Sequence, residues 1–232
     1  MVGDSFEYTK NGLFGDLTRW FLLFICQVFY PLWMGYQWKI YQGKSPMAPL
    51  ENWIEMLING VKLIIVNFVY LLIPIIVFVV SGGLAVVNLL ISNPDNPVAI
   101  ISAVTALAVA IVISIVVLFI FSLLGIIANI RFARMDSFGE AFNFNAILEH
   151  LRKIGWGSYI LALIVLFLVL LIAAIIAMVL FLILGIILAL IPFIGPFITL
   201  LEFIIVLILI GPFFGVWGAR YITMIYDSIE NA

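Results

Sequence analysis

The chain has 232 residues, of which 66% are hydrophobic and 9% are charged, with a formal net charge of −2. Soluble domains carry about 25% charged residues, so this composition leaves too little polar surface for a fold that faces water on all sides. Cys26 is the only cysteine and lies in an apolar stretch, which excludes a disulfide framework or a cysteine-based metal site within one chain.

Five blocks of the chain contain no Asp, Glu, Lys or Arg. They are residues 20–38, 63–94, 96–130, 154–201 and 203–219. A helix needs about 20 such residues to cross the hydrocarbon core of a bilayer, and none of the blocks alternates like a strand of a membrane β-barrel. The sequence therefore predicts an all-α fold, a polytopic transmembrane helical bundle that forms a single integral membrane domain over residues 1–232.

We expect about five spans, separated by two short neutral turns and two long charged connections. The predicted spans are 18–38, 61–90, 98–130, 157–190 and 197–221. The first is the least regular, because Pro31 interrupts it and the preceding segment GLFGDLTRW could form an interfacial helix. A re-entrant first segment would move the N-terminus to the opposite side of the membrane.

Basic residues lie almost entirely on one side of this layout: Lys39, Lys44, Lys62, Arg131, Arg134, Arg152, Lys153 and Arg220, against Lys10 and Arg19 on the other. Lys and Arg accumulate in cytoplasmic loops, so the C-terminus and both long connections are expected in the cytoplasm. With five spans, the N-terminus then faces out. Five tryptophans fall at the same inner boundary, where indole rings favour the headgroup layer: Trp33, Trp38, Trp53, Trp156 and Trp217.

Each long connection carries apolar residues at helical spacing, which predicts two cytoplasmic-side interfacial amphipathic helices. The first apolar face consists of Leu50, Trp53, Ile54, Leu57, Ile58 and Val61, with Asn59 on the polar face. The second consists of Phe144, Ile147, Leu148, Leu151 and Ile154, with His150 on the polar face. We expect His150 to be solvated, and the interfacial anchors to be Trp53, Trp156, Lys62, Arg152 and Lys153.

These elements recur at an offset of about 94 residues, which indicates a parallel internal repeat. The first copy covers about 18–90 and the second about 98–190, and an extra span follows at about 197–221. Parallel repeats occur in transporters, where sites lie between the copies, but duplication is also a common way to build any helical bundle.

Two stretches resemble a known family. They are GYQWKIYQGKSPMAPLENWIEMLINGVKLIIVNFVYLLIP and ARMDSFGEAFNFNAILEHLRKIGWGSYI. Both are similar to the prokaryotic, largely archaeal, membrane family known as domain of unknown function 4013, and the resemblance extends over nearly the whole chain. Where that family has an acidic residue before Leu-Pro, this chain has Met47-Ala48-Pro49. The resemblance implies a topology and a microbial plasma membrane, and it implies no activity.

Small residues at four-residue spacing mark two faces for close helix packing, because helices in lipid associate through such faces. They are Ser102, Ala106, Ala110 and Ser114 in the third span, and Gly211, Gly215 and Ala219 in the fifth. Spans two to four are longer than the bilayer core, so they must tilt or project, and projecting apolar surface predicts a homo-oligomer.

Three polar residues fall at membrane depth: Glu202, Gln27 and Asn67. They are candidates for a polar pathway, since an ionisable group in a span usually faces a cavity or a partner. Alternatively, Glu202 reaches toward the interface or stays protonated, and the two amides hydrogen-bond between helices.

These features favour a homo-oligomeric passive channel or permease, in which one Glu202 per chain would line the pore. The alternative is a non-transport membrane scaffold, assembly factor or lipid-organising protein built on the interfacial helices. An enzyme is not expected, because no nucleophile, base or metal-ligand cluster is apparent. Membrane lipids are the expected partners, with no nucleic acid, cofactor or metal.

Overall fold

The computed structural model describes residues 1–92, 96–189 and 195–229, and its regular elements over these ranges are all helical. The helices are α1 (Val2–Leu13), α2 (Leu17–Val28), α3 (Tyr30–Tyr41), α4 (Trp53–Ser92), α5 (Pro97–Met135), α6 (Phe138–Ala141), α7 (Phe144–Ile154), α8 (Trp156–Ala189), α9 (Gly195–Tyr226) and the 3₁₀ turn η1 (Asp227–Ile229). In the described residues, four helices are long and apolar enough to cross a membrane, and a fifth span exists only if α2 and α3 count as one.

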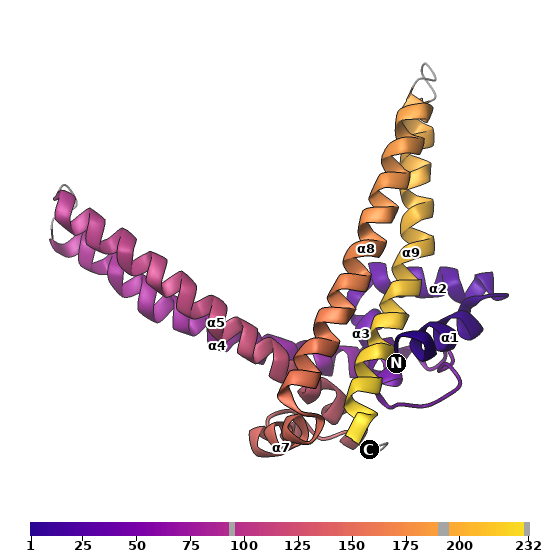
Figure 1. The fold of residues 1–232 in the computed structure, drawn as a ribbon, viewed down its shortest axis with the longest axis horizontal. Helices are drawn as coiled ribbons and strands as arrows, with labels where there is room; N and C mark the ends of the chain where they lie inside the picture. Colours follow the sequence, from indigo (N-terminus) through magenta and orange to yellow (C-terminus); the bar gives the residue numbers. More distant parts are fainter. Residues whose placement is uncertain (93–95, 190–194, 230–232) are drawn as a thin grey trace.

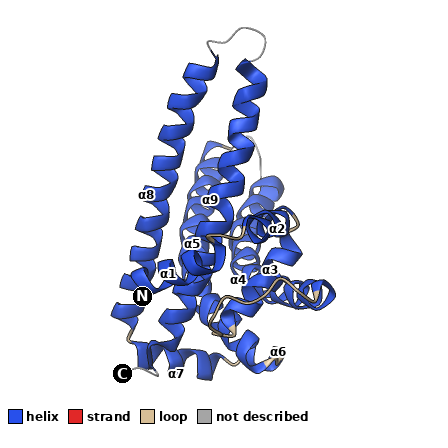
Figure 2. Cartoon of the chain, turned by 90° about the vertical axis from the view of Figure 1, so that its right-hand side faces the viewer, coloured by secondary structure: helices blue, strands red, loops and turns tan. Residues whose placement is uncertain are grey.

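The long helices form two hairpins that diverge from a common base. α4 packs along α5, and α8 packs along α9. Figure 1 shows the two hairpins pointing in different directions, so that their outer ends lie far apart. The base holds α1, α7 and η1, and Figure 2 shows α6 beside α7 below the hairpins. We call the parts of the hairpins beyond the base the arms.

Helix α4 is one unbroken element of 40 residues, about 60 Å long. The predicted interfacial helix is therefore its first turns and not a separate element. Its predicted apolar face is exposed, with Ile54 77% accessible, whereas Asn59, expected in water, is 9% accessible. The reason is that α3 covers the opposite face of these turns, where Met56 and Leu63 are buried.

The predicted first span is bent by 120° between α2 and α3. Phe29 ends one helix and begins the other, and Pro31 lies in the first turn of α3. Since proline has no N–H, it cannot continue the hydrogen bonding of α2 into α3. Helix α2 lies across α9, because the side chains of Trp20 and Gln27 reach the carbonyls of Leu209 and Gly211, two neighbouring levels of one helix.

Helix α3 connects the two hairpins. It contacts α4, α5 and α9, and the hairpins also meet directly, where the Tyr159 hydroxyl of α8 donates to the Leu123 carbonyl of α5 at 2.7 Å. Against α4 the two backbones touch: a Cβ at Gly60 would overlap the Pro31 carbonyl, and one at Gly35 would overlap the Met56 carbonyl. Against α9, a Cβ at Gly215 would come within 2.7 Å of the Trp33 ring. Glycine is required where helices approach this closely.

The second predicted amphipathic helix is separate, as α7. The Asn143 side chain caps it by accepting a hydrogen bond from the Ala146 N–H at 3.2 Å. Gly155 ends it with a φ of +87°, a conformation that glycine adopts without strain. Its buried side includes Ile147 and Leu151.

The N-terminus and the last described residues of the chain lie at the base. The Trp217 indole N–H, near the end of α9, donates to the Val2 carbonyl at 3.4 Å, and Ser5 contacts Met224 at 3.3 Å. Helix α1 therefore lies at the same end of α9 as the C-terminus. This arrangement differs from the predicted five-span layout, in which the N-terminus faces the opposite side, and it matches the re-entrant alternative for the first segment.

This arrangement predicts that α1 and the α5–α6 turn are reached from the same face of the membrane. In a Cys26→Ala background, Lys10→Cys and Ser137→Cys each place one thiol at an exposed position. A membrane-impermeant maleimide should label both variants in the same vesicle orientation, with the Cys26→Ala protein as the thiol-free control. Labelling from opposite faces would restore the five-span layout.

Candidate functional site

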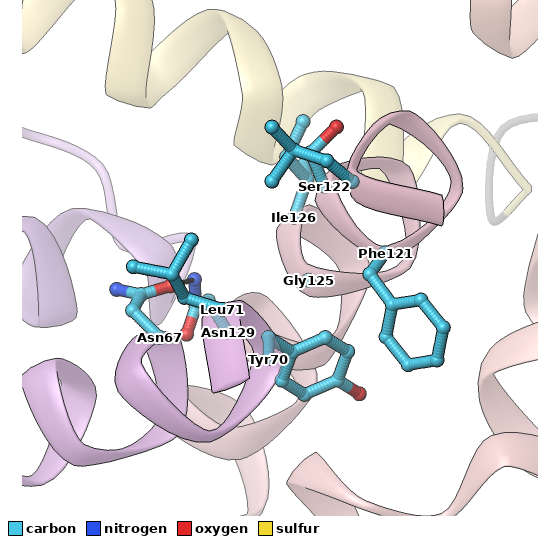
Figure 3. A pocket seen from close by; sticks show the side chains of 9 residues that line it. Asn67, Tyr70, Leu71, Phe121, Ser122, Gly125, Ile126 and Asn129 are labelled. Carbon is cyan, nitrogen blue, oxygen red and sulfur yellow. Dashed lines mark hydrogen bonds between the residues drawn. The ribbon is translucent and has the colours of Figure 1, made fainter. Parts of the chain in front are cut away.

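A groove between α4 and α5 contains two polar side chains that are hydrogen-bonded to each other, Asn67 and Asn129. Its first cavity has a volume of about 310 Å³ and is lined by Asn67, Tyr70, Leu71, Leu118, Phe121, Ser122, Gly125, Ile126 and Asn129. The Asn129 amide donates to the Asn67 carbonyl oxygen at 2.7 Å, across the two helices. Figure 3 shows these two amides side by side, with the Tyr70 ring between them and Phe121.

The groove continues toward the outer end of the arm as a second cavity of about 300 Å³. The two cavities share Leu71 and Leu118, and the second is otherwise lined by Pro74, Ile75, Phe78, Ile111, Ser114 and Ile115. Its lining is almost wholly apolar. The Ser114 hydroxyl is buried there and has no hydrogen-bond partner. We call the two cavities together the α4–α5 groove.

Tyr70 lines the first cavity and connects α4 to the base. Its hydroxyl donates to the Ala141 carbonyl at 2.7 Å, which joins α4 to the α6–α7 segment. Its ring stacks on Phe142 at 5.9 Å and meets Phe121 edge-on at 6.1 Å. Asn67 lies five residues along α4 from Lys62, about 7.5 Å, so the polar end of the groove lies close to the charged base.

Gln27 and Asn67, two of the three candidates for a polar pathway, do not share a site. Asn67 belongs to the α4–α5 groove, whereas the Gln27 amide donates to the Gly211 carbonyl at 2.7 Å, in the α2–α9 contact. Pro212 lies next to Gly211 inside α9 and has no N–H to donate within the helix. Glu202 lies in α9, and its side chain is outside the described part of the structure.

The small-residue faces have different partners. Gly211 and Gly215 lie against Gln27, which occupies the space that a side chain would fill, and Ala219 is buried. On α5, Ala110 approaches Gly82 of α4. Ser114 lines the α4–α5 groove, while Ser102 and Ala106 line a smaller cavity of about 240 Å³ near the outer end of the same hairpin.

The predicted anchors all lie at the base. Trp53 and Trp156 are exposed, at 38% and 40%, and Arg152 is exposed on α7. Lys153 pairs with Glu149 at 2.8 Å, and Lys62 pairs with Asp136 at 3.2 Å. The other three boundary tryptophans, Trp33, Trp38 and Trp217, are buried in the core instead of facing headgroups.

Two arginines, for which the sequence predicts only a role in sidedness, hold the base together. Arg134 of α5 donates to the Tyr41 carbonyl at 2.7 Å and to the Asp227 carboxylate at 2.6 Å. Arg220 of α9 donates to the Gly43 carbonyl at 3.2 Å and lies 4.7 Å from the centre of the Tyr8 ring. Bonds to charged groups in a half-buried setting are stronger than neutral ones, so these pairs tie α1, α3, α5 and α9 together.

Comparison with known proteins gives a family. A family model described as protein of unknown function DUF4013 matches residues 20–182, more than two thirds of the chain. The chain belongs to this family. The match contains α3 to α7 complete and most of α8, and it leaves α1 and α9 outside, which is less than the coverage expected from the sequence. No curated protein and no solved structure matches the chain.

Sequence reasoning missed Asn129, Gly35 and the role of Gly60. Asn129 is a polar residue inside a charge-free block, the same signal that marked Asn67, so it could have been found. The contact at Gly60 could not have been found, because nothing in the local sequence says which helix approaches this glycine.

No group of three or more His, Cys, Asp or Glu side chains that could hold a metal occurs in the described ranges.

His150 is buried, not solvated as expected. It is 8% exposed, its ring stacks on Tyr226 at 3.8 Å, and its Nε2 lies 3.0 Å from the Tyr226 carbonyl oxygen. The carbonyl can only accept, so we place the proton of the neutral ring on Nε2. Burial lowers the pKa of His150, and the bond to Tyr226 partly opposes that shift.

This environment predicts a loss of stability in acid. The unfolded chain binds a proton at His150 as pH falls below about 6.5, whereas the folded chain resists protonation, so the free energy of unfolding should fall with pH there. Thermal unfolding in mild detergent between pH 7.5 and 5.5 measures this. His150→Gln should remove part of the slope, while an unchanged slope would place the titrating group elsewhere.

Proposed function

We propose that this protein is a non-transport membrane scaffold that organises lipid around its two hairpins. The observation that carries this proposal is the separation of base and arms. Hydrogen-bonded polar and charged groups concentrate at the base, whereas the most apolar stretch of α8 buries none of its residues against the rest of the chain. Such surface is stable only against hydrocarbon or a partner of similar polarity.

The positions of the polar residues argue for a scaffold over a channel. Gln27 of α2 bonds to α9, and Asn67 of α4 bonds to α5, so the two bonds involve different hairpins. Each bond holds two helices together. A conducting path needs polar groups in series that are available to the solute. The distribution of basic residues further supports a cytoplasmic base and C-terminus. The family resemblance supports the plasma membrane of a prokaryote as the location.

Exposed groups at the base suit contact with lipid headgroups. Trp53 and Trp156 are amphipathic rings at the ends of the two hairpins, and Arg152 and Lys153 lie on α7 between them. Anionic headgroups attract such cations, and indole rings favour the interface. Homo-oligomerisation through the arms belongs to the same proposal, and we expect no catalytic activity.

Liposome flux tests the scaffold against the channel. Purified protein reconstituted into liposomes should give no more flux of cations, anions or small polar solutes than empty liposomes, with a known pore as positive control. Flux that Glu202→Gln abolishes would instead support a homo-oligomeric channel lined by this carboxylate. Flux that the substitution leaves unchanged would also contradict the scaffold and would exclude Glu202 as the pore residue.

A further inference from the structure

We propose that the α4–α5 groove binds one hydrocarbon chain of a membrane amphiphile, with a hydroxyl group at the polar end of that chain held by the Asn67–Asn129 pair. The inference deepens the proposed lipid-organising function by naming a site and a ligand class, and it rests on that function only for the membrane setting.

The polar end of the groove has unmet hydrogen-bonding capacity. Asn129 is 9% exposed, and its carbonyl oxygen has no partner although its amide nitrogen is bonded to Asn67. Buried polar atoms in folded proteins are almost always paired, so an unpaired one on the wall of a cavity points to a missing donor. A hydroxyl group can donate to the free carbonyl oxygen of Asn129. It can also accept, so it would still fit if the oxygen and nitrogen of both amides were exchanged by a flip.

The groove is polar at the end nearer the base and apolar farther out, as a lipid is polar at its headgroup and apolar along its chain. Its Asn end lies about 7.5 Å along α4 from Lys62 at the charged base, and it runs toward Pro74 and Phe78 farther out in the arm. From Asn67 to Phe78 the groove covers about 16 Å of α4. A chain in one leaflet likewise has its polar end near the interface and its apolar end toward the midplane.

The dimensions favour a hydrocarbon chain over a helix of a second copy. The two cavities hold about 310 and 300 Å³ in sequence along the hairpin. A helix with its side chains is about 10–12 Å across, so a neighbouring helix could insert only single side chains. The single unpaired hydroxyl of Ser114 in the apolar part does not interrupt a chain, because a buried serine is small.

Photo-cross-linking in nanodiscs of phosphatidylglycerol and phosphatidylethanolamine tests the site. The probe is hexadecanol with a diazirine at mid-chain, compared with its methyl ether, which cannot donate a hydrogen bond. Peptide mapping by mass spectrometry should find adducts concentrated at residues 67–78 and 111–129. Because one hydrogen bond separates the probes, the alcohol should label these segments about two- to tenfold more than the ether.

Three variants make the test specific. Asn129→Leu should remove the preference for the alcohol while the ether still labels the groove. Ser122→Trp, at an exposed position on the rim, should reduce labelling by both probes and leaves the Asn pair intact. Asn88→Leu, which lines the outer cavity of the same hairpin, should change neither and serves as the matched control.

Equal labelling on all faces of the hairpin would overturn the proposal and leave only bulk lipid contact. A preference for the alcohol that survives Asn129→Leu would do so too, as would cross-links from these segments to a second copy of the chain. If Asn129→Leu fails to fold, Ser122→Trp still decides the outcome. Flux through liposomes would contradict the scaffold proposal but not the proposed binding site in the groove, so the two failures are distinguishable.

Discussion

The backbone contact between α3 and α4 is the constraint on which the rest of the arrangement depends. Gly35 and Gly60 allow the two helices to approach until carbonyl groups touch the facing glycines. This contact fixes α3 beside the start of α4, and the opposite side of α3 receives α9 through Trp33 and Gly215. The relative position of the hairpins follows from how α3 packs against both and from direct contacts between them, such as the buried hydrogen bond from the Tyr159 hydroxyl of α8 to the Leu123 carbonyl of α5.

Polar interactions differ between the base, which carries charged groups suited to water, and the arms, which are suited to hydrocarbon. At the base, Arg134 and Arg220 bond to the backbone carbonyls of Tyr41 and Gly43 around the end of α3, and Arg134 also bonds to the Asp227 carboxylate. Along the arms, few polar side chains occur, and most bond to the carbonyl one turn earlier, as Ser81 and Thr105 do. The Asn67–Asn129 pair is an exception, because it joins two helices and still leaves one buried oxygen free.

The sequence predicts the helical membrane fold well because charge-free length is a property of each segment by itself. Four of the expected spans correspond to α4, α5, α8 and α9. What it predicts poorly depends on neighbours. Periodicity around Trp53 identifies an apolar face correctly, but only α3 decides that the opposite face, with Asn59, is the buried one. His150 similarly has a polar position on its own helix, yet Tyr226 covers it.

If the backbone contact at Gly60 holds the base together, thermal unfolding should distinguish two alanine variants of α4. Gly60→Ala should lower Tm by about 3–10 °C, because its Cβ overlaps the Pro31 carbonyl of α3. Gly83→Ala, on the same helix with nothing within 4 Å, should leave Tm unchanged or raise it slightly. Equal effects of the two substitutions would contradict the account.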